Sequence, residues 1–227
     1  MPKRLNPGLI VSCQALPDEP MYGEGVMAKF AEAALEGGAE GIRTSSVSDI
    51  ASIAEKIHGS LPIIGLIKRN YPDSEIYITP TLREVKELIE SPCDVIALDV
   101  TGRPRPNGEK LEDLVAYLRA HTDQYLMADT ASEEDALLAD SLGFDYVSTT
   151  MRSYTPGTKG VAIPDLAYLA SLKKLSLKAT LVAEGGIHDR PTLEKILALG
   201  YQYVVIGGAI TRPKQITEYY HQAFLAK

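Results

Sequence analysis

The sequence contains few cysteines and none of the motifs in which they bind metal. Its 227 residues include only Cys13 and Cys93, which lie far apart and form neither a CxxC pair nor a Cys/His cluster. Disulfide frameworks and structural zinc sites need several suitably spaced thiols or histidines. The four histidines also lack ligand spacing with Asp or Glu. We therefore expect two reduced thiols and no metal site.

Long apolar runs are missing as well. Residues 1–7, MPKRLNP, lack the hydrophobic region of a signal peptide, and no run approaches the ~18 apolar residues of a membrane span. The formal net charge is −7, and the 23 basic residues are dispersed. These features predict a cytoplasmic protein that binds neither membranes nor nucleic acid. A small anionic substrate stays compatible with them, because a local pocket can be positive on an acidic protein.

The signatures of several enzyme classes are also absent. No GxGxxG follows the first apolar run, where residues 16–20 read LPDEP, so a dinucleotide-binding turn is not predicted. Neither GxSxG nor a Cys/His nucleophile pair is visible.

What the sequence does contain is a repeated pattern of short apolar runs separated by amphipathic stretches. Capping-box spacing begins at Ser46, Thr81 and Ser132, and glycines at 37–38, 143 and 200 end the amphipathic stretches. This alternation predicts an α/β protein in which residues 1–227 form a single (β/α)8 TIM barrel domain. The eight predicted strands are 9–15, 41–44, 63–68, 95–100, 125–130, 146–150, 180–185 and 203–208.

Two ionisable residues at the ends of these runs are the candidate catalytic groups. Lys68 shares a face with Ile64 and Leu66, and such an apolar floor lowers the pKa of a lysine and makes its neutral amine available as a base. Glu184 ends the seventh run and suits a general acid, or an ion-pair partner that would raise the pKa of Lys68. The sequence leaves open which effect dominates. A solvent-directed Lys68 and a purely structural Glu184 are the alternatives.

Three further run ends are candidate substrate contacts. Gln14 suits an amide or hydroxyl group, Arg43 a hydroxyl or phosphate, and Asp129 a sugar hydroxyl or the lysine. Each could instead belong to a buried polar network at the barrel rim, and Asp99 is a more doubtful candidate of the same kind.

Glycine pairs follow the last two runs and predict a phosphate site. Gly185-Gly186 and Gly207-Gly208 permit close approach of backbone N–H groups to an anion, as in the strand 7 and strand 8 loops of many barrels. Arg212 offers a guanidinium to the same anion, and Thr211 is expected to act as an N-cap. The connections 101–109 and 151–160 follow strand ends and are either lids over the mouth or solvated loops.

Together these residues resemble the N-acylglucosamine-6-phosphate 2-epimerase family. The resemblance runs from Leu9 to the C-terminal helix, and two stretches depart from it, Thr44-Ser45 and Met151-Arg152-Ser153-Tyr154. The matching motifs are SCQA (12–15), GIR (41–43), IGLIKR (64–69), YITPT (77–81), ALD (97–99), RPRP (103–106), MAD (127–129), AEGG (183–186) and GGAITR (207–212).

The resemblance implies an enzyme that interconverts N-acetylmannosamine 6-phosphate and N-acetylglucosamine 6-phosphate in sialic acid breakdown. It implies that Lys68 is catalytic with Glu184 as its partner, that Gln14, Arg43 and Asp129 contact the sugar, and that the glycine pairs and Arg212 bind phosphate. Proton transfer at carbon 2 requires no redox cofactor. A homodimer is a further expectation.

Two other functions remain open from the residues. A Schiff-base aldolase would use Lys68 as a nucleophile, and borohydride would trap its adduct. A noncatalytic sugar-phosphate sensor would need a partner-binding surface, and the ionisable groups around the mouth argue against it.

Overall fold

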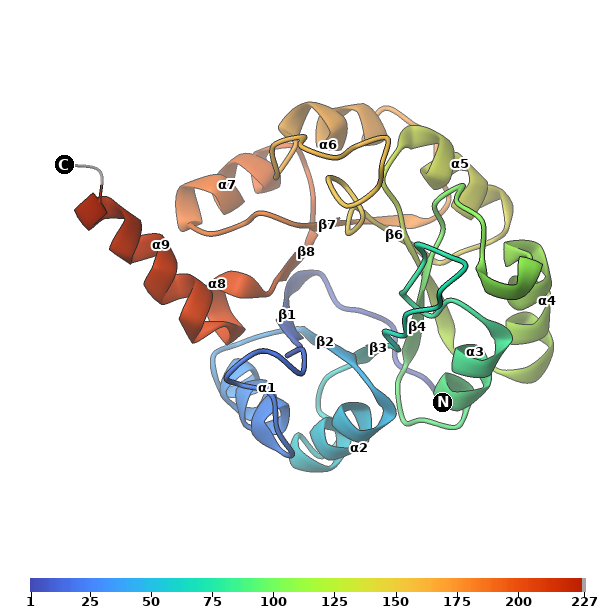
Figure 1. Ribbon diagram of the computed structural model, residues 1–227, viewed down its shortest axis with the longest axis horizontal. Helices are drawn as coiled ribbons and strands as arrows, with labels where there is room; N and C mark the ends of the chain where they lie inside the picture. Colours follow the sequence, from blue (N-terminus) through green and yellow to red (C-terminus); the bar gives the residue numbers. More distant parts are fainter. Residues whose placement is uncertain (226–227) are drawn as a thin grey trace.

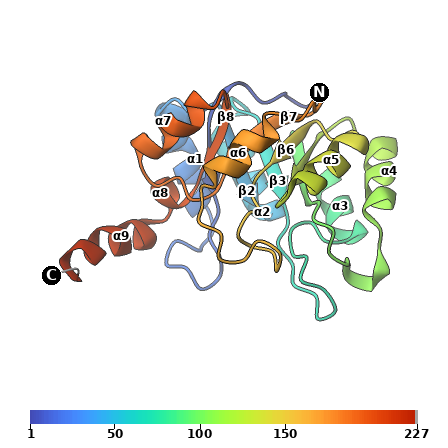
Figure 2. The ribbon, with the colours of Figure 1, turned by 90° about the horizontal axis from the view of Figure 1, so that it is seen from above.

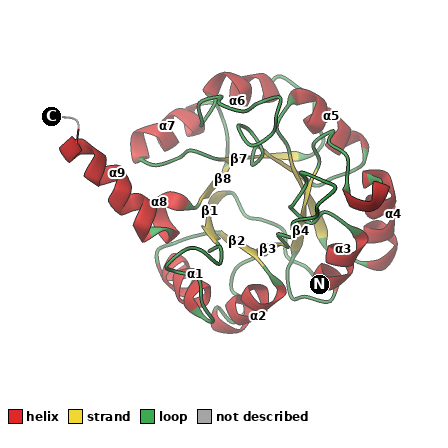
Figure 3. Cartoon of the chain, viewed as in Figure 1, coloured by secondary structure: helices red, strands yellow, loops and turns green. Residues whose placement is uncertain are grey.

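Eight parallel strands close into a ring in the computed structural model, which describes residues 1–225 (Figures 1 and 3). Each strand pairs with its neighbour in sequence, and the last pairs with the first, Gly8 opposite Tyr203. The predicted (β/α)8 barrel is thus confirmed; the last two residues of the expected domain lie outside the described residues. The strands are β1 (Gly8–Cys13), β2 (Gly41–Ser45), β3 (Ile63–Leu66), β4 (Val95–Asp99), β5 (Tyr125–Asp129), β6 (Tyr146–Ser148), β7 (Thr180–Glu184) and β8 (Tyr203–Ile206).

Helices alternate with the strands and surround the ring (Figure 1). A short 3-10 turn, η1 (Pro106–Gly108), interrupts the β4–α4 connection. Figures 1 and 2 show that the last helix, α9, points away from the barrel. The helices are α1 (Val26–Glu36), α2 (Val47–Lys56), α3 (Leu82–Ile89), α4 (Leu111–His121), α5 (Glu133–Ser141), α6 (Leu166–Leu172), α7 (Arg190–Ala198), α8 (Gly208–Thr211) and α9 (Pro213–Leu225).

Helix ends follow the predicted signals. Thr81 and Ser132 form complete capping boxes with Glu84 and Asp135, which satisfies backbone N–H groups that the first helical turn leaves free. Ser46 accepts a hydrogen bond from the Asp49 N–H in the same way. Gly38, Gly143 and Gly200 adopt positive φ just beyond helix ends, as a terminating glycine requires.

The apolar residues form two layers, one inside the ring and one between the ring and the helices. Alternate strand residues point to opposite faces, so each strand contributes to both layers. The inner layer includes Ile64 and Leu66, which confirms that the face leading to Lys68 points inward. The remaining inner strand residues are Ile10, Val95, Ala97, Met127, Tyr146, Val182 and Val205.

Seven of the eight predicted strands end one or two residues earlier than expected. β1 stops at Cys13 and β3 at Leu66, so Gln14 and Lys68 lie beyond the parallel ladder. Lys68 instead forms an antiparallel bridge with Ile78. The chain leaves the ring at residue 67 and returns at residue 79, where the Thr79 N–H donates to the Ile67 carbonyl at 2.8 Å. We call residues 67–80 the lysine arm.

The expected N-cap at Thr211 is wrong. Thr211 is the last residue of α8, and its hydroxyl donates to the Ser12 carbonyl at 2.7 Å. The Thr211 side chain therefore links the end of α8 to β1 and does not cap a helix. Within residues 1–225, no helix combines the length and apolar character needed to cross a membrane.

Candidate active site

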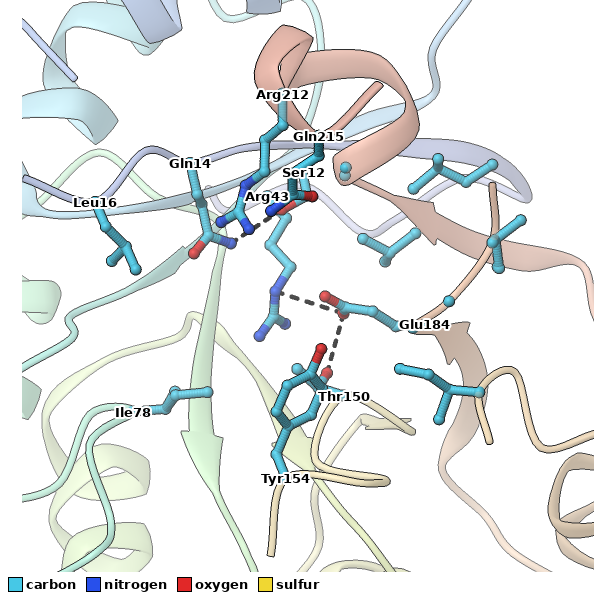
Figure 4. A pocket seen from close by; sticks show the side chains of 18 of the residues that line it. Ser12, Gln14, Leu16, Arg43, Ile78, Thr150, Tyr154, Glu184, Arg212 and Gln215 are labelled. Atoms are coloured by element: carbon cyan, nitrogen blue, oxygen red, sulfur yellow. Dashed lines mark hydrogen bonds and ion pairs between the residues drawn. The ribbon is translucent and has the colours of Figure 1, made fainter. Parts of the chain in front are cut away.

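A cavity of about 690 Å³ opens at the carboxyl ends of the strands, where inward-facing residues of several strands meet (Figure 4). The sequence-predicted residues that line it are Gln14, Arg43, Lys68, Glu184, Gly185, Gly186, Gly207, Gly208 and Arg212. Asp129 lies beneath this lining and is fully buried. Asp99 is also buried, but it binds Arg103 and Thr101, which lie outside the lining.

Four connected polar side chains lie at the bottom of the cavity, three in its lining and Asp129 beneath them, and we call them the floor network: Arg43, Asp129, Thr150 and Glu184. Arg43 is only 1% exposed; its Nη2 donates to Asp129 Oδ2 at 2.7 Å, and its Nε lies 3.5 Å from Glu184 Oε2. Thr150 Oγ1 lies 2.8 Å from Asp129 Oδ1 and 3.0 Å from Glu184 Oε2. One buried cation therefore faces two carboxylates, an arrangement that favours protonation of one of them.

Of the two carboxylates, Glu184 is the one whose pKa is raised. Burial raises the pKa of Glu184, and the negative charge of Asp129 adds to the rise, whereas Arg43, Thr150 and Ser148 oppose it. Burial destabilises the charged form most where water cannot reach it. The carboxyl group of Glu184 therefore holds a proton at a higher pH than a solvated glutamate does.

Lys68 faces this group from the opposite side of the ring, because β3 and β7 are four positions apart in a closed ring of eight. Burial lowers the pKa of Lys68 to about 8, with help from the cationic neighbours Arg43 and Arg212 and against Glu184 and Asp129. The sequence left open whether burial or a neighbouring carboxylate dominates the pKa of Lys68, and in the structure burial dominates. Glu184 pairs with Arg43, and among the described residues it makes no ion pair with Lys68 within 4.0 Å.

Gln14 brings an unused acceptor to the cavity wall. Its Nε2 donates to Ser12 Oγ at 3.0 Å, while its Oε1 is buried and has no hydrogen-bond partner among residues 1–225 (Figure 4). A buried acceptor without a partner costs free energy, so such a group usually marks a place where a ligand donates. A substrate N–H or O–H meets that requirement.

The glycine pairs and Arg212 form the other side of the cavity, and we call them the glycine rim. Gly185 and Gly186 have φ of 106° and 70°, and a Cβ at Gly186 would overlap the backbone of Ile163. A Cβ on Gly207 would stand 3.2 Å from that of Ser12. Arg212 Nε lies 3.3 Å from Glu19 Oε1. Bare backbone beside a partly exposed guanidinium is well suited to an oxyanion.

The two long connections have different surroundings. Residues 101–109 bind the lysine arm: Arg105 is buried and donates to the Thr79 and Pro80 carbonyls at 3.2 and 3.0 Å. No residue of this connection lines the cavity, whereas the connection 151–160 brings Tyr154 to it (Figure 4). Arg152, which departs from the family pattern, pairs with Asp165 at 2.8 Å and anchors this second connection.

Several lining residues were not among the predicted site residues. Ser12 shares the inward face of the predicted strand 9–15 with Gln14, so strand alternation was the signal that pointed to it. Thr150 ends the predicted strand 146–150, and its place at a strand end was the signal in that case. Tyr77, Tyr154, His188 and Gln215 come from loops and from the start of α9, for which apolar periodicity gives no signal.

Neither cysteine lines the cavity. Cys13 and Cys93 are free and buried, and burial raises the pKa of each thiol to about 12. Residues 1–225 contain no group of three or more His, Cys, Asp or Glu side chains that could hold a metal ion.

The fold and the site define a class: a (β/α)8 barrel in which buried ionisable side chains face glycine-rich loops across a cavity. Distant barrels support the fold alone, such as a thiamine phosphate pyrophosphorylase from Pyrococcus furiosus with a TM-score of 0.63 at 18% identity, over 92% of this chain and 90% of that one. Residues 27–226 match the NanE family, described as "Putative N-acetylmannosamine-6-phosphate epimerase". The chain belongs to this family.

Individual relatives agree over nearly the whole chain. A "Putative N-acetylmannosamine-6-phosphate 2-epimerase" of Staphylococcus carnosus is 49% identical over 219 residues, 95% of this chain and 96% of the relative. A protein of the same description from Clostridium perfringens is 50% identical, over 92% and 93% of the two chains. The solved structure of the N-acetylmannosamine-6-phosphate 2-epimerase from Clostridium perfringens has a TM-score of 0.90 at 48% identity, covering 95% of this chain and 92% of that one.

Proposed function

We propose that this protein is an N-acetylmannosamine-6-phosphate 2-epimerase, an isomerase that interconverts this sugar phosphate and N-acetylglucosamine 6-phosphate in sialic acid breakdown. The observation that carries the proposal is the placement of two ionisable groups in one cavity, Lys68 on the lysine arm and Glu184 at the end of β7, with pKa values shifted toward their neutral forms. A base on one face of carbon 2 and an acid on the other can together invert this carbon, and a single base that both removes and returns the proton is the alternative.

The reaction depends on the acidity of carbon 2. Ring opening of the sugar exposes an aldehyde at carbon 1, and the proton on the neighbouring carbon 2 becomes removable because an enolate forms. In one direction the neutral amine of Lys68 takes this proton, and the carboxylic acid of Glu184 returns one to the opposite face. The reverse direction starts from protonated Lys68 and ionised Glu184, so the pair serves both directions.

The remaining site residues position the substrate. The glycine rim binds the 6-phosphate through backbone N–H groups and Arg212, which fixes carbon 2 between the two catalytic groups. Gln14 accepts a hydrogen bond from the open-chain sugar, and Arg43 contacts it from the cavity floor. Asp129, expected to touch the sugar, is held by Arg43 and Thr150 instead, so we assign it the task of orienting them.

The test is incubation of the protein with N-acetylmannosamine 6-phosphate in D2O, with carbon 2 observed by NMR. We expect N-acetylglucosamine 6-phosphate that carries deuterium at carbon 2. Failure to form N-acetylglucosamine 6-phosphate would overturn the proposal. Conversion without deuterium at carbon 2 would instead argue against proton exchange with solvent and leave a shielded proton returned by one base, or a different chemistry. Borohydride inactivation that depends on substrate, with a covalent adduct on Lys68, would instead establish the aldolase alternative.

A homodimer is part of the proposal, and α9 supports it. The helix points away from the barrel and has no buried residue of its own (Figure 1). Tyr220, Phe224 and Leu225 are 67%, 71% and 70% exposed, and adjacent exposed apolar side chains of this size mark an interface. Sedimentation should give a dimer for the wild type and a monomer for the double variant Tyr220→Ser, Phe224→Ser.

A further inference from the structure

Thr150 lies between two carboxylates that cannot both use its proton. Thr150 follows β6 by two residues, and its Oγ1 is 3.0 Å from Glu184 Oε2 (Figure 4). The same oxygen is 2.8 Å from Asp129 Oδ1. Ser148, on the same inward face, has its Oγ 2.9 Å from Thr150 Oγ1 and 3.3 Å from Glu184 Oε2. A threonine hydroxyl has one proton to donate, so it serves one carboxylate at a time.

The other donors of the floor network divide unequally between these carboxylates. Asp129 receives a short hydrogen bond from Arg43 Nη2 at 2.7 Å, so it remains partnered whichever way the hydroxyl turns. Glu184 has only Arg43 Nε at 3.5 Å, which makes no hydrogen bond, and the longer contact with Ser148. When Glu184 is ionised, it therefore depends on Thr150 more than Asp129 does.

We propose that Thr150 is a positioning residue whose hydroxyl proton turns from Asp129 to Glu184 when Glu184 transfers its own proton to carbon 2. The inference rests on the proposed function. The O–H bond of Glu184 breaks, a C–H bond forms at carbon 2, and the electron pair stays on the carboxylate. The Thr150 O–H bond stays intact and only rotates about Cβ–Oγ1. Because the described contacts to the carboxylate all use Oε2, Oε1 is left for the substrate.

Other charged groups around Glu184 also affect its protonation, but none of them donates a hydroxyl proton to it. Arg43 on β2 favours its ionised form, Asp129 on β5 opposes it, and Lys68 on the lysine arm faces it across the cavity. All three remain when only the Thr150 hydroxyl is removed. A change in the titration of Glu184 on that removal therefore measures the hydroxyl itself.

The decisive variant is Thr150→Val, which keeps the shape of the side chain and deletes the hydroxyl. Loss of a donor to the ionised form should raise the pKa of Glu184 by about 1 to 2 units, as expected for a hydrogen bond to a charged group. The same loss should lower kcat/KM about 10- to 100-fold. Thr150→Ser restores the hydroxyl and should recover both quantities. The titration is followed by carbon-13 NMR of labelled glutamate carboxyl groups, with Glu184→Gln to assign the signal.

Thr149 supplies the matched control. Its hydroxyl also contacts Glu184, but through the backbone: it accepts from the Glu184 N–H and donates to the Glu184 carbonyl, both at 2.9 Å. Thr149→Val should lower stability and leave the titration of the carboxyl in place. An unchanged Glu184 titration in Thr150→Val, or an equal shift in Thr149→Val, would overturn the inference. The two proposals can fail separately. If Thr150→Val shifts the Glu184 titration but the wild type forms no N-acetylglucosamine 6-phosphate, the hydroxyl contact is supported and only the proposed function is overturned.

Discussion

The floor network and the glycine rim face the same cavity but are built in opposite ways. The floor network consists of side chains: Arg43 and Asp129 are 1% and 0% exposed, and their charges are matched before any substrate arrives. The rim consists mostly of bare backbone, and its single cation, Arg212, is 27% exposed. Proton transfer gains from desolvated groups with shifted pKa values, whereas a doubly charged phosphate needs donors that it can reach from water. The two regions should therefore respond differently to mutation.

The strongest contrast should come from Lys68→Met. The variant keeps the apolar stem and removes the base, so kcat should fall by about 10²- to 10⁴-fold while KM changes little. Steady-state kinetics with N-acetylmannosamine 6-phosphate measures both constants. A folded variant with most of its activity would exclude Lys68 from proton transfer.

Loss of the floor cation should show its structural role. Arg43→Met leaves the Asp129 carboxylate buried without its charged partner, which should cost about 3 to 5 kcal/mol of unfolding free energy. Urea denaturation followed by circular dichroism measures this loss. The double variant Arg43→Met, Asp129→Leu should recover most of the stability but not the activity. A single variant as stable as the wild type would show that the buried pair contributes nothing to stability.

At the rim, Arg212→Ala should act on binding. Removal of a charge-assisted contact to phosphate should raise KM about 10- to 100-fold with little loss of stability, because Arg212 is partly exposed. Glu19→Gln removes only its ion-pair partner and serves as the control, with a change in KM below about threefold. Neither substitution should alter turnover of unphosphorylated N-acetylmannosamine. Equal kcat/KM for the phosphorylated and unphosphorylated sugars in the wild type would contradict the phosphate site.

The smallest effect concerns stability and pH. Because burial lowers the pKa of Lys68 to about 8, the folded protein binds fewer protons at this site than the unfolded chain between about pH 8 and the usual lysine value. The penalty for burying the cation is complete below pH 8 and disappears as the pH rises toward 10.5. Lys68→Met should thus be more stable than the wild type at pH 7 by about 1 to 3 kcal/mol, and the advantage should shrink by pH 10. A constant difference across this range would argue against a buried charge.

The sequence predicted the ring of strands and the inward placement of most site residues, because apolar alternation fixes which side chains face the interior. It did not predict that Lys68 sits on an arm beyond β3, since hydrogen bonds between residues distant in sequence, such as those from Arg105 to the Thr79 and Pro80 carbonyls, hold that arm. The Thr211 prediction failed for the same reason. Threonine is a common N-cap residue, but here its hydroxyl donates to the carbonyl of Ser12, which is distant in sequence and close only in the folded barrel.

The bond from Thr211 to Ser12 also has a consequence for synthesis of the chain on the ribosome. β1 leaves the ribosome before β8, the strand that it pairs with. The Thr211 hydroxyl, which bonds to Ser12 on β1, comes 199 positions after Ser12 in the sequence. A nascent chain that lacks β8 has two unpaired sheet edges, and such edges favour aggregation. The cavity, including the rim at Gly207-Gly208, is therefore completed only after β8 and Thr211 have left the exit tunnel.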